Sequence, residues 1–514
     1  ARMQLNWEGI PEYPPEHENR EHPFGRDLNI TGPHSLMHLV DISIYRGGSE
    51  TLKNWLLAIE PDVERTKQNQ LLVEELKPLA HFRDRLMLRA KLTRARQSEK
   101  DWDMDTLQRW LKQNREKSYR KSLALLWGLS GINILLVLLY VFGILNPWFI
   151  LSFLIYLLVY NYNSGKIKGI FDESYQIDKL LRRFSAILLY LENFPFKEQS
   201  ELKAFCSLYH NNDSSPSRYL RKIALIASAA SLQKNDLLWI VLNTLVPWDL
   251  SFAELLNRYK RELDEKLSRW LDRFYELEAL CSLANFAWLN PGYTFPEIVD
   301  PGESLPFEAT DLGHPLIPHQ ERVTNDISIS EIGSILLITG SNMSGKSTFL
   351  RTLGVNLVLA FAGGPVVASR LQTVPFRIYS SINVVDSLDA GLSHFYAEVK
   401  RLRGMLDALR QPHAYPLFYL VDEIFRGTNN RERLIGSTSF LKKVAGSRGI
   451  GIISTHDLEL TELEQDIPKL TNWHFEETIK EGKMHFEYRL KPGPCPTTNA
   501  LRIMEMEGLP VEDS

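Results

Sequence analysis

The chain has 514 residues, enough for roughly two to four domains with large buried cores. Its formal net charge is −4, which excludes a global basic footprint of the kind that drives nucleic-acid binding but leaves a local basic patch open. The three cysteines, Cys206, Cys281 and Cys495, have no C-x-x-C spacing. They give neither a disulfide framework nor a zinc site, and they favour a reducing compartment.

The N-terminal stretch, residues 1–33, holds five prolines and predicts an extended arm. It begins Ala1-Arg2-Met3, as a fragment or a processed chain would, and its polar residues do not form a signal peptide.

Helical spacing of apolar residues begins at Ser35 and predicts a first helical core over residues 34–120. The pattern is interrupted at Gly47-Gly48, and a further helix is predicted over residues 63–90. The residues of that helix expected to face inward are Leu71, Leu72, Leu76, Leu79 and Phe82.

Residues 121–162 predict an apolar helical hairpin. Leu123–Leu145 is a run of 23 residues without a charge, long enough to cross a bilayer as a helix. Asn146-Pro147 predicts a turn, and Trp148–Tyr160 is a second, shorter apolar run. Basic residues flank the pair on both sides, as expected for a hairpin with both ends in the cytoplasm. The aromatic residues expected to anchor it at the interface are Trp127, Trp148, Tyr160 and Tyr162.

Two interpretations of the hairpin stay open. It is either a transmembrane element at the cytoplasmic face of the cell membrane, or a hairpin buried in a helical domain or an oligomer interface of a cytoplasmic protein.

The second helical part covers residues 163–290. It has an apolar stripe through residues 177–191, then predicted helices near 217–243 and 251–289, the last a long amphipathic lever. Residues 291–322 are rich in Pro and Gly and predict a connector. From Val323 to Ser514, short β-branched runs alternate with helical patterns and predict an α/β domain. The predicted strands are Ile335–Thr339, Ile378–Val384, Leu417–Val421 and Ile450–Ser454.

A phosphate-loop motif follows the first of these strands. Residues 340–348, GSNMSGKST, fit G-x-x-x-x-G-K-[ST], with an apolar strand before them and a helical pattern after them. Small residues let backbone N–H groups turn towards phosphate oxygens, and the following helix adds its positive N-terminal end. Lys346 is expected to contact the β- and γ-phosphates, and Ser347 to ligate Mg²⁺. The predicted nucleotide-binding residues are Gly340, Ser341, Asn342, Met343, Ser344, Gly345, Lys346, Ser347 and Thr348.

Two later strand ends complete a nucleotide-hydrolysing site. The strand at 417–421 ends in Asp422-Glu423, where Asp422 is predicted to hold Mg²⁺ through water and Glu423 to act as general base. The strand at 450–454 leads to His456, which is predicted to hydrogen-bond the γ-phosphate or the attacking water, or else to cap a loop. ATP and Mg²⁺ are therefore the predicted ligands. The predicted fold class is multidomain: an all-α lever/core domain with an apolar helical hairpin, followed by an α/β P-loop ATPase domain of ABC type.

These motifs together resemble the MutS family of DNA mismatch-repair ATPases. The resemblance rests on Asn342-Met343 within the phosphate loop, on residues 422–429 (DEIFRGTN), on Ser393-x-Phe395-x-x-Glu398 and on residues 454–457 (STHD). It implies a homodimer in which Ser393, the first residue of the trans signature that also contains Phe395 and Glu398, contacts the γ-phosphate bound by the neighbouring subunit. It also implies ATP-driven opening and closing of the lever helices, which clamp DNA in that family.

The chain also departs from that family's pattern. No Phe-x-Glu mismatch-reading motif precedes Asp27, and no β-rich clamp segment is visible between the predicted levers, where the apolar hairpin lies instead. Ser344 replaces a usual Gly, and Arg322 falls where the family places an adenine-stacking Phe. The resemblance is thus to a membrane-associated variant that lacks the mismatch-recognition and clamp domains.

Three functions follow from these features. The first is an ATP-driven dimeric clamp acting on DNA and tethered to membrane lipid through residues 123–160. The second is a membrane-anchored mechanochemical ATPase acting on a protein or on the bilayer, without DNA. The third is a nucleotide-gated scaffold with little turnover.

Overall fold

The computed structural model describes residues 1–11, 21–95, 119–164, 168–210, 215–230, 236–302, 305–341, 343–382, 394–425, 428–480 and 483–496. Contacts divide the chain into two compact units, unit 1 (residues 1–79 and 278–514) and unit 2 (residues 80–277). The domain boundaries predicted from composition stay a prediction. By contacts, the N-terminal helices group with the C-terminal part of the chain.

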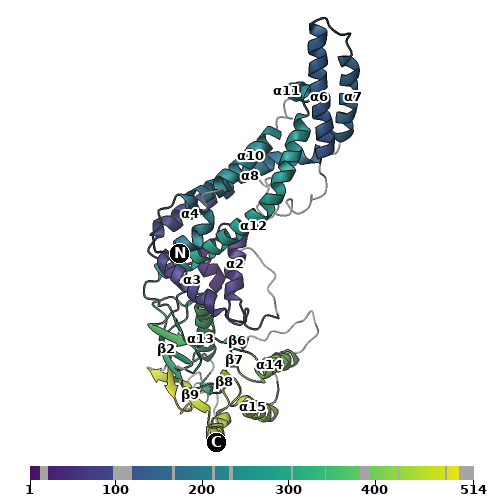
Figure 1. Ribbon diagram of the computed structural model, residues 1–514. Coiled ribbons are helices and arrows are strands. Elements are labelled where there is room, and N and C mark those ends of the chain that lie inside the picture. Colours follow the sequence, from purple (N-terminus) through teal and green to yellow (C-terminus); the bar gives the residue numbers. More distant parts are fainter. Residues whose placement is uncertain are drawn as a thin grey trace. The chain divides into compact units, whose positions relative to one another are not determined.

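The described residues of unit 2 form helices joined by turns and loops, without a strand (Figure 1). Its elements are α4 Ala80–Ala95, α6 Arg120–Val141, α7 Phe149–Ser164, α8 Lys168–Glu192, α9 Glu201–Phe205, η3 Cys206–Tyr209, α10 Pro216–Ala230, α11 Asp236–Leu245 and α12 Trp248–Leu289, the last of which continues into unit 1. Helices α6 and α7 lie side by side and confirm the predicted hairpin (Figure 1).

The core of unit 2 forms along α8. Its predicted stripe is confirmed from residue 180 onward, because Leu180, Leu181, Phe184, Leu188 and Leu191 are at most 2% exposed. The side chain of Ile177, also predicted in the stripe, is not among those that the structure describes. Phe184 meets Phe274 of α12 edge to face, with ring centroids 5.7 Å apart. The apolar spacing read from the sequence therefore gives the contact face of this helix.

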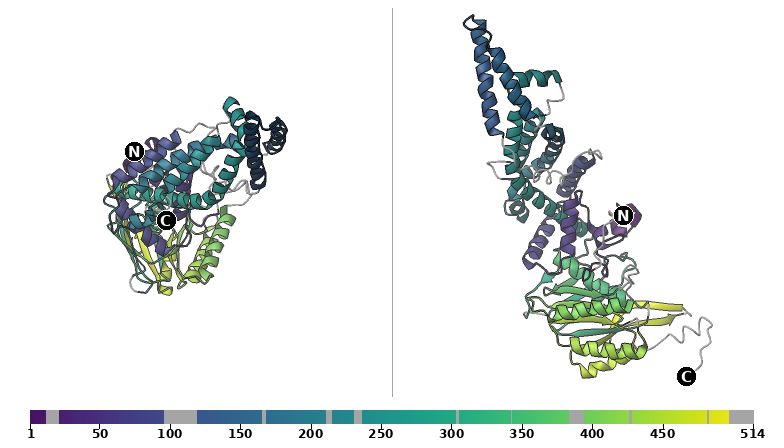
Figure 2. Two further views of the ribbon diagram at one scale, coloured as in Figure 1. Left: turned by 45° about the horizontal axis from the view of Figure 1, so that its top comes forward. Right: turned by 90° about the vertical axis from the view of Figure 1, so that its right-hand side faces the viewer.

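Unit 1 contains two sheets. Its strands are β1 Glu297–Ile298, β2 Phe307–Leu312, β3 Asn325–Ile329, β4 Ile335–Thr339, β5 Arg370–Thr373, β6 Arg377–Ser381, β7 Leu417–Asp422, β8 Gly449–Ser454, β9 Leu470–Lys480 and β10 Lys483–Pro492. The larger sheet has six strands in the order β10-β9-β4-β8-β7-β6, parallel except for β10. Strands β9 and β10 form the yellow ribbon in the right-hand view of Figure 2. The smaller sheet has the order β1-β5-β2-β3.

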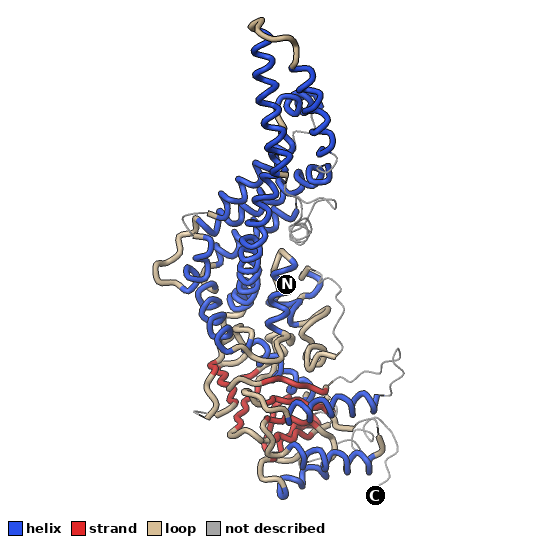
Figure 3. Tube along the Cα trace, turned by 45° about the vertical axis from the view of Figure 1, so that its right-hand side comes forward, coloured by secondary structure: helices blue, strands red, loops and turns tan. Residues whose placement is uncertain are grey.

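Helices cover both faces of the six-stranded sheet (Figure 3). The helices of unit 1 are η1 Arg2–Gln4, η2 Trp7–Gly9, α1 Leu36–Val40, α2 Arg46–Leu56, α3 Val63–Leu76, α13 Lys346–Phe361, α14 His394–Arg410, α15 Asn430–Val444, η6 Leu458–Glu462 and α16 Leu463–Asp466. On one face, Met405 of α14 and Leu441 of α15 pack with Tyr419 of β7. On the other, α13 lies so close to β7 that a Cβ on Gly354 would come within 2.8 Å of Leu420. Adjacent residues of β7 thus point to opposite faces.

Several sequence predictions for the helices are wrong. Gly47 and Gly48 do not break a helix but lie in the first turn of α2, and a Cβ on Gly48 would meet the Glu278 carboxylate at 2.5 Å. The helix predicted over 63–90 is two helices, α3 and α4, because Pro78 between them cannot donate a backbone hydrogen bond. Leu71, predicted to face inward, is 52% exposed.

Two further predictions are corrected. The helix expected near 217–243 is divided into α10 and α11, and the connector predicted over 291–322 contributes strands β1 and β2. Its alternating pattern buries Phe307, Ala309 and Leu312 while Glu308 and Thr310 are less buried, which is a strand signal within a Pro- and Gly-rich stretch.

The end of the predicted arm is tied to the α/β domain. The Asp27 carboxylate accepts hydrogen bonds from Ser380 Oγ at 2.8 Å and from the Ile382 N–H at 3.0 Å. Its carbonyl accepts one from Arg351 Nε of α13 at 3.0 Å. Arg401 of α14 donates to the carbonyl of Pro23 at 2.6 Å. This segment therefore joins α13 to β6 and α14.

Candidate active site

The phosphate-loop residues lie between β4 and α13, as the motif predicts. All five residues of β4 are buried, and the loop then turns through Gly340 at φ 146° into α13, whose N-cap Gly345 has φ 108°. A Cβ on Gly340 would also lie 2.7 Å from the Phe475 carbonyl oxygen, so both backbone angle and space require glycine there. The start of a 16-residue helix thus faces the loop, where an anion is favoured.

Lys346 is the cation of this loop and is only 5% exposed. Its Nζ donates to the carbonyls of Gly340 and Ser341, both at 2.7 Å. Burial lowers the pKa of the Lys346 ammonium, while the carboxylates of Glu423, Asp422 and Glu477 act in the opposite direction. Ser341 donates to Glu477 of β9, so an acidic side chain borders the loop. Met343 is 83% exposed at φ 75°, and Asn342 lies outside the described residues.

The two predicted acids stand at the carboxyl end of β7. Because β7 and β8 are parallel neighbours, Asp422 pairs with Ser454, whose hydroxyl donates to the Asp422 carboxylate. Glu423 turns out of the strand at φ 51°, and its N–H donates to the Ser454 carbonyl at 3.0 Å. The left-handed backbone of Glu423 is a strained conformation of the kind that is often found at functional sites.

His456 faces the Glu423 carboxylate, with Nδ1 3.6 Å from Oε1. The next residue, Asp457, forms a two-pronged ion pair with Arg433 of α15, at 2.8 Å from Nε and 2.6 Å from Nη2. The side chains of Arg433 and Asp457 are only 12% and 15% exposed, so this pair is shielded from water. Sequence reasoning missed Arg433, which fixes the loop that carries His456.

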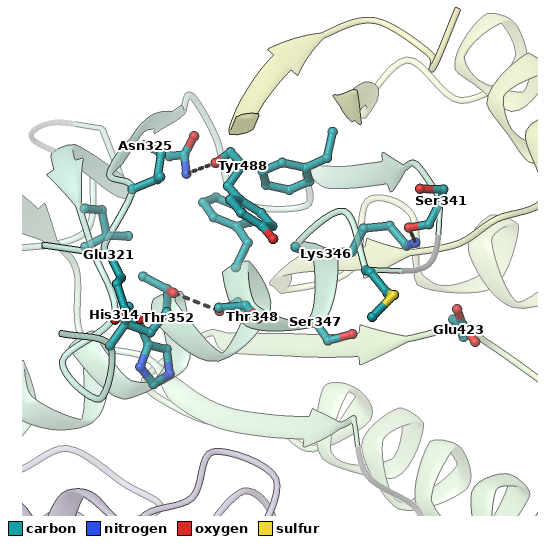
Figure 4. A pocket seen from close by; sticks show the side chains of 17 residues that line it. His314, Glu321, Asn325, Ser341, Lys346, Ser347, Thr348, Thr352, Glu423 and Tyr488 are labelled. Carbon is teal, nitrogen blue, oxygen red and sulfur yellow. Dashed lines mark hydrogen bonds between the residues drawn. The ribbon is translucent and has the colours of Figure 1, made fainter. Parts of the chain in front are cut away.

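A cavity of about 480 Å³ runs from Glu423 past the phosphate loop to β3 and β10 (Figure 4). Lys346, Ser347 and Thr348 line its middle, and Tyr488 lies on the far side of Lys346 from Glu423 (Figure 4). The volume suits a ligand of nucleotide size.

Tyr488 is the aromatic residue at the far end, and the sequence did not indicate it. It has φ 54° within an irregularity of the β9–β10 pairing. The Asn325 side chain holds that irregularity by donating to the Tyr488 carbonyl at 3.0 Å and accepting from the Leu490 N–H at 2.7 Å. As a result the ring stands over Gly345, where an added Cβ would lie 3.0 Å from its Cδ1.

Arg322 does not line the cavity. It donates to the Ile317 carbonyl at 2.7 Å and lies over the ring of Tyr293, 5.5 Å from the centroid. His314 does line the cavity and is 8% exposed, and burial lowers its pKa to about 4, so the ring is neutral at pH 7. Its Nδ1 accepts from the Leu316 N–H at 3.1 Å.

The predicted trans signature is only partly described. Ser393 lies outside the described residues. Phe395 is 38% exposed on α14, and Glu398 is 4% exposed and accepts a hydrogen bond from the Phe425 N–H. Glu398 thus joins α14 to the loop after Asp422 and Glu423, while Asn429 caps α15 by accepting from the Glu432 N–H at 3.0 Å.

The oxygen donors of the site fit Mg²⁺ bound together with a nucleotide. The Ser347 hydroxyl lines the cavity, and the Asp422 carboxylate ends β7, which β8 separates from β4 in the sheet. Mg²⁺ takes few protein oxygens when phosphate and water supply the rest. In the part of the chain that the structure describes, no group of three or more His, Cys, Asp or Glu forms a metal site of its own.

The chain is similar to known proteins over its C-terminal half. Residues 336–512 match the family described as MutS domain V. The DNA mismatch repair protein MutS of an Exiguobacterium species is 34% identical over 267 residues, 51% of this chain and 30% of that protein. The proteins of the same name from Thermus thermophilus and Aquifex pyrophilus are 31% identical over 263 residues and 30% identical over 270 residues, 51% and 50% of this chain and 31% of each of those proteins.

The chain spans about 30% of the length of the curated relatives it matches. The phosphate loop, the Asp422-Glu423 pair and His456 all fall within the matched residues 336–512. The match to MutS domain V and the MutS-named relatives over half of the chain together support its membership of the MutS family.

Proposed function

We propose that the protein binds ATP in this cavity and hydrolyses it to ADP and phosphate. The single observation that carries the proposal is the placement of Glu423 beside His456 at one end of a cavity whose middle is lined by Lys346 and Ser347. MutS domain V is an ATPase domain, which supports the same interpretation.

Different residues of the cavity bind the nucleotide and activate the attacking water. The backbone N–H groups of the loop and Lys346 hold the phosphates, and Tyr488 offers an aromatic face to the base. Glu423 accepts the proton of the attacking water, and His456 orients that water or the γ-phosphate. Ser347 and Asp422 would hold Mg²⁺, which when bound neutralises charge on the phosphates.

We also propose that the protein forms an ATP-driven homodimer that acts on DNA in a process related to mismatch repair. The curated relatives are named for DNA mismatch repair, which supports it. Charge distribution adds support. Unit 2 holds 30 Lys and Arg against 21 Asp and Glu, a formal charge of +9, whereas unit 1 holds 29 against 42, a formal charge of −13. A positive helical unit suits a polyanionic partner.

We further propose that the hairpin tethers the protein to a membrane. Helix α6 is apolar and long enough to span a bilayer, and only 11% of its most apolar window is buried. This observation favours the alternative function, a membrane-anchored mechanochemical ATPase that acts on a protein or the bilayer without DNA.

The experiment is an ATPase assay on full-length protein recovered with and without detergent, in the presence and absence of duplex DNA. Glu423→Gln is expected to bind ATP and to lower turnover at least about a hundredfold, whereas Glu459→Gln, at an exposed acid outside the cavity, should behave as the unmodified protein. Unchanged hydrolysis by Glu423→Gln would remove Glu423 from the role of base. A rate that no DNA alters, in protein that partitions into membranes, would favour the alternative.

A further inference from the structure

The hairpin of α6 and α7 is apolar on every side, not along one stripe. Between Lys121 and Lys166 the sequence has no Asp, Glu, Lys or Arg. Exposed apolar side chains surround the outer part of both helices, among them Leu135, Leu138, Val141, Ile150, Leu151 and Leu154, each between 49% and 71% exposed. A protein groove covers one face of a helix, whereas lipid tails cover all of them, so the fitting occupant is a bilayer.

The base of the hairpin differs from its outer part, because side chains at the base form hydrogen bonds. Ser130 and Tyr156 donate to carbonyls at the C-terminal end of α11, those of Leu245 and Asn243, the latter at 2.7 Å. Tyr160 donates to the Asp249 carboxylate at 3.0 Å, and Trp127 Nε1 to Ser251 Oγ at 3.1 Å. The base is therefore held by polar groups of the α11–α12 junction.

The ionisable groups of this junction exclude it from the hydrocarbon. Asp249 is 3% exposed beside Tyr160, and Glu254 pairs with Arg120 at 3.2 Å. Placing such groups at the bilayer centre is costly. The hydrocarbon boundary must then lie beyond Ser130 and Tyr156, with Trp127 at headgroup level, where Trp is favoured.

The part that remains for the hydrocarbon is short. From Gly131 to Val141, α6 rises about 16 Å at ~1.5 Å per residue. The hydrocarbon core of a bilayer is about 30 Å thick, so this length equals one leaflet.

The tip satisfies part of its own backbone. Gly143, at φ 73°, ends α6 by donating to the Tyr140 carbonyl at 3.0 Å, while the Ile144 N–H donates to the Leu139 carbonyl at 2.9 Å. Trp148 N–H donates to the Asn146 carbonyl at 2.6 Å. These hydrogen bonds reduce the cost of placing the turn away from water.

We infer that the hairpin enters one leaflet of an anionic bilayer to about its midplane and does not cross it, with the α11–α12 junction at headgroup level. The +9 charge of unit 2, which includes Arg120 and the exposed Lys121 at the hairpin base, selects anionic headgroups. This inference rests on the proposed membrane association and fixes its depth and lipid class.

The test uses full-length protein in which Cys495→Ser removes the one native cysteine that is not buried, since Cys206 and Cys281 are buried. A spin label is then attached at the hairpin tip through Asn146→Cys or at the hairpin base through Lys121→Cys. On vesicles of phosphatidylcholine and phosphatidylglycerol, the label at the hairpin tip should collide with oxygen and not with a nickel chelate, and the label at the hairpin base should do the reverse. Without the spin label, a maleimide trapped inside the vesicles should leave the thiol introduced by Asn146→Cys unmodified. Modification from inside would show a spanning hairpin, with Trp148 at the far interface, and would overturn the inference.

Flotation separates failure of this inference from failure of the tether. Failure of the protein to float with any vesicles would refute membrane association itself. If the protein then binds duplex DNA, the positive charge of unit 2 serves nucleic-acid binding instead. Equal flotation with phosphatidylcholine alone would refute the anionic selectivity. Leu138→Asp should lower vesicle affinity about a hundredfold. Leu225→Asp, at a side chain 60% exposed on α10, is the matched control and should leave it unchanged.

Discussion

Replacing Tyr488 by Ala is expected to weaken ATP binding while leaving the fold and the chemical step intact. The ring is 43% exposed over Gly345, so its removal leaves no buried cavity. Aromatic stacking on a base contributes about 1–3 kcal/mol. Only one face of this ring is available, because Phe486 stacks against it with centroids 5.8 Å apart. We therefore take about 1–2 kcal/mol, which corresponds to a roughly 5- to 30-fold rise in the Kd for ATP.

The assay is titration of a fluorescent ATP analogue, together with kcat and KM for ATP hydrolysis. Tyr488→Phe keeps the ring and loses only the hydroxyl, so it should bind as the unmodified protein does. Asn325→Leu removes both hydrogen bonds that hold the irregularity of the β9–β10 pairing around Tyr488, and it should weaken ATP binding as Tyr488→Ala does. Equal weakening by Phe and Ala, or a fall in kcat at unchanged Kd, would refute stacking as the role of this residue.

Three further outcomes are expected from the site. Glu423→Gln should lower kcat at least about a hundredfold with ATP still bound, measured by filter binding and phosphate release. The pKa of His314 is lowered to about 4 from 6.5, so the unfolded chain binds the extra proton between these values and stability falls as pH falls through them. About 2 kcal/mol should be lost between pH 7.5 and 5 in urea unfolding, and His314→Asn should lose that much less. Arg433→Gln should release Asp457 and His456 and lower kcat about tenfold at similar KM, whereas a rise in KM alone would contradict a positioning role.

The buried strands of the six-stranded sheet were predictable from the sequence because each is an uninterrupted apolar run. β4, β7 and β8 are covered by helices on both faces, so their residues need no alternation to be recognised. β2 was missed because its polar residues alternate with buried ones inside a Pro- and Gly-rich stretch. Leu71 was misassigned because helical spacing gives a stripe, but only the neighbouring elements decide which stripe is covered.

In the site too, residues in local motifs were predictable, whereas residues positioned by distant partners were not. Local motifs placed Lys346, Asp422 and Glu423, because strand ends in a parallel sheet meet at one edge. Tyr488 and Arg433 depend on partners far away in the sequence, Asn325 and Asp457, and no local pattern marks them. Arg322 was placed by analogy at the base-binding end, but its hydrogen bonds to Ile317 turn it elsewhere.

The hydrogen bonds of Asp27 with Ser380 and Ile382 affect the order in which unit 1 can form during synthesis. Unit 1 is discontinuous, and Asp27 finds Ser380 and Ile382 only after more than 350 further residues have been made. At ~5–20 residues per second, the N-terminal segment waits roughly 20–70 s for its partners. The whole of unit 2, including its apolar hairpin, leaves the ribosome during that interval. The hairpin therefore leaves the ribosome before the nucleotide site exists, so bound nucleotide cannot influence the hairpin at that stage of synthesis.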